Sequence, residues 1–158
     1  MKLCAALIAL AVSSVTAFAG EVANVSGVGK GKATSMVEAV GKGHLLMQSV
    51  TEYASYKSAD PKSPFNGMTG KCWGAIEIKP PTASGKGNCA FATTSGDKHF
   101  NTWTATGLAK DGALVGTWAI VGGSGKFAGA SGGGKFHSLT DRDAGTFVNT
   151  VSGAVVLK

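Results

Sequence analysis

A glycine-dense run between residues 118 and 136 constrains the fold of this chain more than any other segment. A strand-like stretch from Trp118 to Val121 enters this run, and one phenylalanine stands in the middle of the turn. Glycine adopts backbone angles that other residues avoid, and it lets a second backbone approach closely. The run therefore predicts a tight structural corner between two strands, formed by Gly122, Gly123, Gly125, Phe127 and Gly129.

Two incomplete phosphate-binding patterns lie in the same run. Residues 129–136 fit a Walker A loop except at Phe136, which stands where a Ser or Thr would bind magnesium. Residues 123–128 fit the loose dinucleotide fingerprint, but more glycine follows instead of a helix. Both motifs need a helix N-terminus that faces the phosphates. We therefore expect no cofactor, and the sequence also lacks the His-x-x-x-His spacing of a metal site.

The first residues have the organisation of a secretory signal peptide. Lys2 precedes an apolar run over residues 3–15, and Ala17-Phe18-Ala19 is a small-x-small cleavage site. We expect cleavage near Ala19, so that residues 1–19 are the signal peptide and residues 20–158 form a single domain, secreted or periplasmic. No later segment approaches about 18 consecutive apolar residues, so membrane insertion is not expected.

The cysteines and the charge narrow the function classes. Cys4 leaves with the signal peptide, and Cys72 and Cys89 remain in an oxidising compartment, where one disulfide between adjacent strands is the expected state. Loss of Lys2 lowers the formal net charge from +6 to +5. The lysines are scattered and Arg142 is the only arginine, so the sequence does not favour a nucleic-acid partner.

Turn-forming residues recur roughly every 8 to 15 residues, which is typical of short antiparallel strands. Nine strands are too many for one open sheet with a covered face. The predicted fold is therefore all-β, a single antiparallel, approximately eight-stranded, calycin-like barrel. Residues 57–70 are predicted to be a loop, and a candidate lid or mouth. The nine predicted strands are 22–28, 36–40, 44–56, 71–79, 88–94, 99–108, 113–121, 134–139 and 146–157.

Alternation along the strands groups the candidate ligand-binding residues. His99, Asn101 and Trp103 share one face of their strand. An interior that gathered the three tryptophans, with a few polar groups at its edge, would suit an apolar small molecule. A core filled by the same tryptophans is the competing interpretation, because an eight-stranded barrel is only just wide enough for side chains. The candidate ligand-binding residues are Trp103, Trp118, His99, Asn101, Trp73, Glu77 and Glu52.

The pattern Trp-x-x-x-Gly-Gly-Ser-Gly-x-Phe-x-Gly-x-x-Gly, from Trp118 to Gly132, resembles the signature of the allene oxide cyclase and dirigent-like β-barrels. The resemblance implies an eight-stranded barrel with an apolar cavity that holds a reactive small molecule in one conformation. It also implies a homo-oligomer, a dimer or trimer. The glycine corner is structural in these families, so the resemblance transfers a fold and no catalytic residue.

Three functions follow as hypotheses. The first is a barrel that binds an apolar small molecule in its interior. The second is an isomerase or cyclase of the allene oxide cyclase type that acts by cavity preorganisation, with Glu52, Glu77, His99 or Asn101 positioning the substrate. The third is a barrel with a filled core that acts as a structural or surface-interaction protein.

Overall fold

Alternating burial along the strands shows why this chain closes on itself. In β9 (Thr146–Leu157) the side chains of Phe147, Asn149, Val155 and Leu157 are buried, while those between them are mostly exposed. Such a strand has one apolar face, and the face is covered when the sheet curls around it. The same alternation runs through β4 (Thr69–Lys79), where Cys72, Ile76 and Ile78 are buried.

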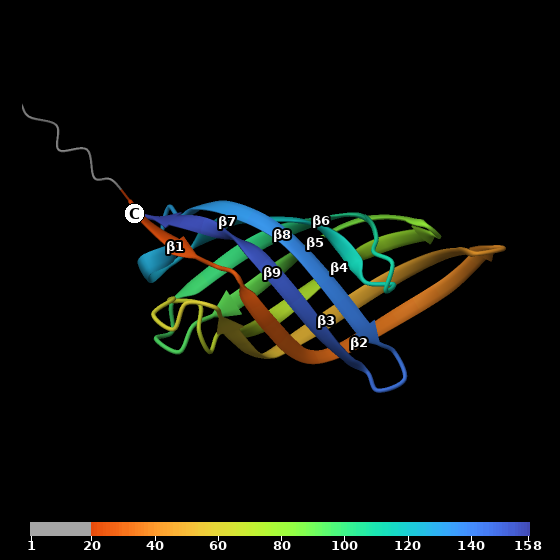
Figure 1. The fold of residues 1–158 in the computed structure, drawn as a ribbon, viewed down its shortest axis with the longest axis horizontal. Coiled ribbons are helices and arrows are strands. Elements are labelled where there is room, and N and C mark those ends of the chain that lie inside the picture. Colours follow the sequence, from red (N-terminus) through yellow and green to blue (C-terminus); the bar gives the residue numbers. More distant parts are fainter. Residues whose placement is uncertain (1–19) are drawn as a thin grey trace, which may run out of the picture.

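The computed structural model describes residues 20–158, and the predicted signal peptide lies outside these residues. Eight antiparallel strands, β2 to β9, form a closed barrel in which each strand pairs with the next and β9 pairs with both β8 and β2 (Figure 1). The predicted all-β barrel is thus confirmed. The remaining strands are β1 (Glu21–Asn24), β2 (Gly27–Gly41), β3 (His44–Ser58), β5 (Thr82–Ala92), β6 (Lys98–Leu108), β7 (Leu114–Gly123) and β8 (Ser131–Asp141).

Some strand boundaries differ from the prediction. The predicted strand 22–28 is interrupted at Val25-Ser26, and its two parts, β1 and the start of β2, lie one after the other along the same edge of β9. Residues 36–40 are not a separate strand but the end of β2. β5 begins at Thr82, six residues before the predicted start, because the turn lies at Pro80-Pro81.

The two ends of the barrel are built differently (Figure 1). At the hairpin end, short turns join β2 to β3, β4 to β5, β6 to β7 and β8 to β9. The opposite, plugged end is covered by residues 59–68, where Phe65 is 1% exposed and Met68 is 4% exposed. The segment predicted as a candidate lid or mouth therefore packs its apolar side chains into one end of the barrel.

The glycine corner completes the plugged end. A single 3₁₀ turn, η1 (Gly125–Phe127), joins β7 to β8, and the Phe127 side chain is fully buried while Lys126 reaches Asp97 at the surface. Phe127 packs against the rings of Phe65 and His99, with centroids 5.3 and 4.9 Å away. The predicted buried position of Phe127 is confirmed, and the backbone of Gly125, with φ of 58°, explains the glycine there.

Candidate functional site

The interior holds a cavity of about 140 Å³ that is partly open to solvent. Buried apolar residues form two clusters, a large one at the plugged end and a small one around Ile76, Ile78 and Ala83 towards the hairpin end. Members of the large cluster, together with Ile76 from the small one, line the cavity. Its aromatic lining includes Tyr53, Tyr56, Phe65, Phe91, Trp103, Trp118 and Phe136.

Glycines in the wall let aromatic rings lie flat against it. A Cβ atom built on Gly74 of β4 or on Gly87 of β5 would collide with the indole of Trp103. These two glycines are directly opposite each other, so together they form a flat seat for that ring. Because the ring lies along the wall instead of across the barrel, space remains at the centre.

Tyr53 and Asn149 form the polar part of the lining. Asn149 Nδ2 donates a hydrogen bond of 2.6 Å to Tyr53 Oη, and each residue is 8% exposed. Desolvation by burial raises the pKa of Tyr53 to about 12, so the phenol stays protonated at neutral pH. Neither residue is among the predicted site residues, although Asn149 stands out as a polar residue between the inward positions of Phe147 and Val151.

The position of Tyr53 depends on a third glycine. Tyr53 on β3 reaches Asn149 on β9 across the intervening strand β2, and its ring lies over Gly29. A Cβ atom at Gly29 would overlap the Tyr53 ring, with Cδ1 only 2.6 Å away. A register shift between Lys30 and Gly31 also turns both Tyr53 and Tyr56 inward.

His99 and Asn101 both line the cavity, as expected from their shared face. His99 Nδ1 lies 3.1 Å from Asn101 Oδ1, and His99 Nε2 lies 3.4 Å from Met68 Sδ. Burial lowers the pKa of His99, with the Asn101 hydrogen bond opposing this shift. The imidazole is thus held neutral within the plugged end, stacked on Phe91 at 5.0 Å.

Trp103 and Trp118 also border the cavity, on the adjacent strands β6 and β7. Trp118 is 9% exposed, and its Nε1 donates to the Ser152 carbonyl at 3.3 Å. Trp103 is partly buried and meets Phe136 edge to face, with centroids 6.3 Å apart. An apolar ligand in the cavity would contact both indoles.

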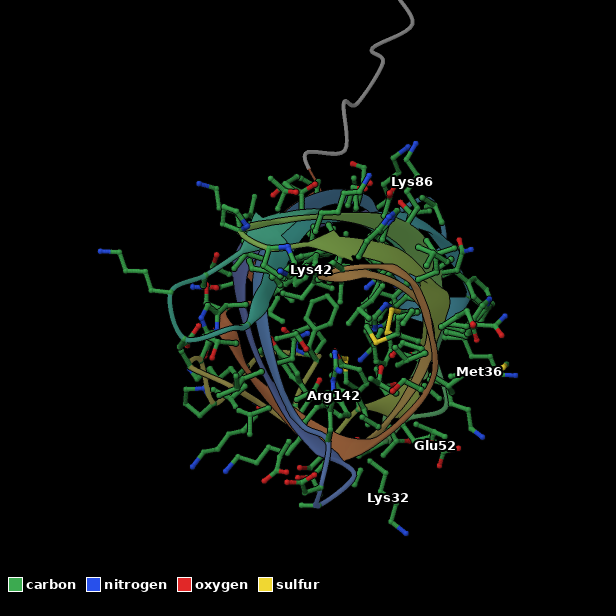
Figure 2. The ribbon with its side chains drawn as sticks, turned by 90° about the vertical axis from the view of Figure 1, so that its right-hand side faces the viewer. Lys32, Met36, Lys42, Glu52, Lys86 and Arg142 are labelled. Atoms are coloured by element: carbon green, nitrogen blue, oxygen red, sulfur yellow. A yellow bond between two sulfur atoms is a disulfide. The ribbon has the colours of Figure 1, made fainter. Side chains whose placement is uncertain are left out.

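The sulfurs of Cys72 and Cys89 are within bonding distance, on directly opposite positions of β4 and β5 with Cα atoms 4.0 Å apart. The pair faces the interior and lines the cavity, and Figure 2 shows it inside the ring of strands. Thr51 and Asn101 lie in register with it on the neighbouring strands, so this row of side chains faces inward together.

Three predicted interior residues are on the outside instead. Glu52 pairs with Lys71 at 2.7 Å and points away from the barrel in Figure 2, and this hydrogen bond lowers the pKa of the carboxyl. Glu77 pairs with His44 at 2.7 Å, which lowers its pKa in the same way. Trp73 borders the cavity, but alternation from the buried Cys72 turns its indole outward, and 46% of it is exposed.

At the hairpin end, the charged side chain of Arg142 extends over the barrel (Figure 2). Arg142, in the turn between β8 and β9, reaches inward over the opening, and its Nη2 lies 4.0 Å from Met47 Sδ (Figure 2). Met47 lines the cavity. A molecule that enters from this end would therefore pass the guanidinium group.

A second hollow, of about 440 Å³, lies on the outer face of β6 to β9. Its lining includes Thr106, Thr117, Lys135 and Thr150, which are exposed side chains. It is larger than the interior cavity but more open, and Phe136 is the one Phe, Tyr or Trp of residues 20–158 in its lining, against several in the interior cavity. We therefore take the interior cavity as the candidate site.

Comparison of the chain with family models, curated proteins and solved structures finds no match. Within residues 20–158, no helix has the length and apolar character needed to cross a membrane. In the same residues, no group of three His, Cys, Asp or Glu side chains is placed to hold a metal ion.

Proposed function

We propose that this protein is a secreted or periplasmic barrel that binds a small, largely apolar molecule in its interior. The observation that carries the proposal is the 140 Å³ cavity, lined by aromatic rings and a few polar groups. Typical ligand pockets start near ~300 Å³, whereas a cavity of about 150 Å³ in another protein binds benzene. The size therefore favours a ligand with a single six-membered ring over a long-chain lipid.

The cyclase alternative has less support than binding. The titratable side chains in the lining are His99, Tyr53 and Tyr56, and both ring nitrogens of His99 already contact neighbours. Glu52 and Glu77, the expected positioning carboxylates, lie outside the barrel. Orientation of a reactive molecule by shape remains the form of catalysis that this lining suits. The likeness to the allene oxide cyclase and dirigent-like barrels rests on the glycine corner and adds no catalytic residue.

A surface role is favoured by a separate observation. Met36, Leu46, Val50 and Trp73 lie at neighbouring positions on the outer face of β2 to β4, and each is between 39% and 69% exposed. Exposed apolar side chains that cluster in this way mark contact surfaces more often than isolated ones do. If the protein acts through its surface, these side chains support a dimer or trimer formed through this face.

Titration with bromobenzene, followed by tryptophan emission, tests the binding proposal. Bromine quenches an adjacent indole, so we expect saturable quenching in the wild type. Trp73→Phe should keep this quenching because its indole is outside, whereas Trp103→Phe combined with Trp118→Phe should remove it. Weak, linear quenching that is lost in Trp73→Phe would instead place the apolar contact on the outer face and contradict the proposal.

A further inference from the structure

One buried polar atom in the cavity has no hydrogen-bond partner among the described residues. This atom is Oδ1 of Asn149, whose side chain lines the cavity and is only 8% exposed. Buried polar groups in folded proteins are nearly always paired, so an unpaired acceptor in a cavity indicates where a donor is to bind. One of the two Nδ2 protons of the same amide is donated to Tyr53 Oη, which fixes the side chain next to that hydroxyl.

The Tyr53 hydroxyl complements this acceptor. It accepts the hydrogen bond from Asn149 Nδ2, which leaves its own proton available as a donor. The two residues therefore offer one acceptor and one donor side by side on the same wall. A hydroxyl group is the smallest neutral group that satisfies both, since it donates one hydrogen bond and accepts another.

The remaining lining argues for a neutral ligand. Within residues 20–158, no Lys, Arg, Asp or Glu side chain lines the cavity. An ionised group placed there would lose its hydration without a counter-ion, at a large energetic cost. Arg142 could pair with an anionic group, but it lies at the hairpin end, outside the lining.

We propose that the ligand is a neutral, ring-sized alcohol whose hydroxyl donates to Asn149 Oδ1 and accepts from Tyr53 Oη. Its hydrocarbon ring packs against the aromatic lining, which includes the edge-to-face pair of Trp103 and Phe136. This inference rests on the proposed function, because it specifies the chemistry of the molecule that the same cavity binds.

Calorimetric titration of the wild-type protein with cyclohexanol, cyclohexanone and cyclohexanecarboxylate tests the inference. The three probes share one ring, and only the alcohol is both neutral and a donor. We expect cyclohexanol to bind about tenfold more tightly than cyclohexanone, as one additional satisfied hydrogen bond implies. Asn149→Leu should abolish this difference, while the matched control Asn88→Leu should keep it, because Asn88 lies on the exposed face of β5 and outside the cavity lining.

The alternative outcomes separate the two proposals. Equal binding of alcohol and ketone by the wild type, or a preference that survives in Asn149→Leu, overturns the assignment to Asn149 but leaves interior binding standing. If the carboxylate binds most tightly, and Arg142→Gln loses this binding, the assignment to Asn149 is also overturned. Arg142 at the hairpin end would then select the ligand. If no probe binds the folded wild type and bromobenzene quenching does not saturate, the proposed function itself fails. The alcohol–ketone comparison needs no variant, so a poorly folding Asn149→Leu does not obstruct the test.

Discussion

At the scale of single residues, Phe127 anchors the plugged end. Its ring is fully buried among Phe65 and His99, and truncation would leave a cavity that the surrounding rings cannot fill. We expect Phe127→Ala to lower the free energy of unfolding by about 3 to 5 kcal/mol, measured by denaturant titration. A loss within about 0.5 kcal/mol, as for a surface substitution, would show that this ring is not part of the core.

His99 should make stability depend on pH. Because burial lowers its pKa below the unfolded value near 6.5, the unfolded chain binds the proton first. The contribution of the neutral imidazole is therefore complete above about pH 6.5 and is lost as the pH falls towards the folded pKa, by at most about 1.4 kcal/mol per pH unit.

Denaturant titrations between pH 7.5 and 5 check this expectation against His99→Gln. The variant should be less stable throughout but should show a shallower pH dependence in this window. His44 and His137 are near the surface and are present in both proteins. Their contributions to the pH dependence of the free energy of unfolding therefore cancel when the two proteins are compared. Identical slopes for the two proteins would contradict the assignment to His99.

We expect any side chain at Gly29 to displace Tyr53 and so to disturb its hydrogen bond with Asn149. The atoms nearest to an alanine Cβ at Gly29 belong to the buried rings of Tyr53 and Tyr56, and the overlap with Tyr53 requires that ring to move. We expect Gly29→Ala to destabilise the fold by about 1 to 3 kcal/mol, measured by denaturant titration. Gly41→Ala is the matched control, since its nearest neighbour would be His44 Cβ at an ordinary 3.7 Å. Equal effects of the two substitutions would show that the ring over Gly29 is not constrained.

At the scale of elements, the hairpin of β4 and β5 is fixed by the Cys72–Cys89 pair. The two cysteines are separated by 17 residues, and closing a loop of this length stabilises a fold by about 3 kcal/mol in the chain-entropy model. We expect a loss of that size when Cys72→Ala and Cys89→Ala are combined, measured by denaturant titration. Complete labelling of both thiols in the folded, unreduced protein would contradict the bonded state.

The sequence predicts the strands better than it predicts which face of each strand is inside. On β3, the outward set from His44 to Glu52 and the inward set from Leu45 to Tyr53 both mix polar and apolar side chains, so alternation alone does not distinguish them. On β4, the buried side of Cys72, Ile76 and Ile78 is more apolar than the side of Trp73 and Glu77. Trp73 borders the cavity, as expected, but its side chain faces outward, and the size of its ring alone does not predict that direction.

The Tyr53–Asn149 pair could not be predicted from the sequence, for a different reason. The two residues are 96 positions apart and come together across β2, only because the barrel closes through β9 and a register shift turns Tyr53 inward. Alternation along a single strand predicts neither the closure of the barrel nor the register shift. By contrast, His99, Asn101 and Trp103 lie on one strand, β6. Their alternation is unbroken because the register shift between β6 and β7 next to Asn101 adds its extra residue to β7, so their shared inward face follows from the period of two.

At the scale of the whole molecule, the barrel is plugged at one end and lined with aromatic rings in the middle. The plug formed by residues 59–68 and the glycine corner leaves the hairpin end as the route to the cavity. Glycines in the wall keep Trp103 flat and so preserve space that a ring-sized molecule can occupy. The proposed binding function therefore depends on whether that space admits a ligand.

Anomalous diffraction from crystals soaked in bromobenzene shows whether the interior cavity binds a ring-sized molecule. The bromine scattering locates the molecule without any assumed pose. We expect one dominant bromine peak inside the barrel, in contact with the ring of Trp103. Bromine peaks confined to the outer face beside Trp73, with an unoccupied interior, would contradict it and would favour a protein that acts through its surface.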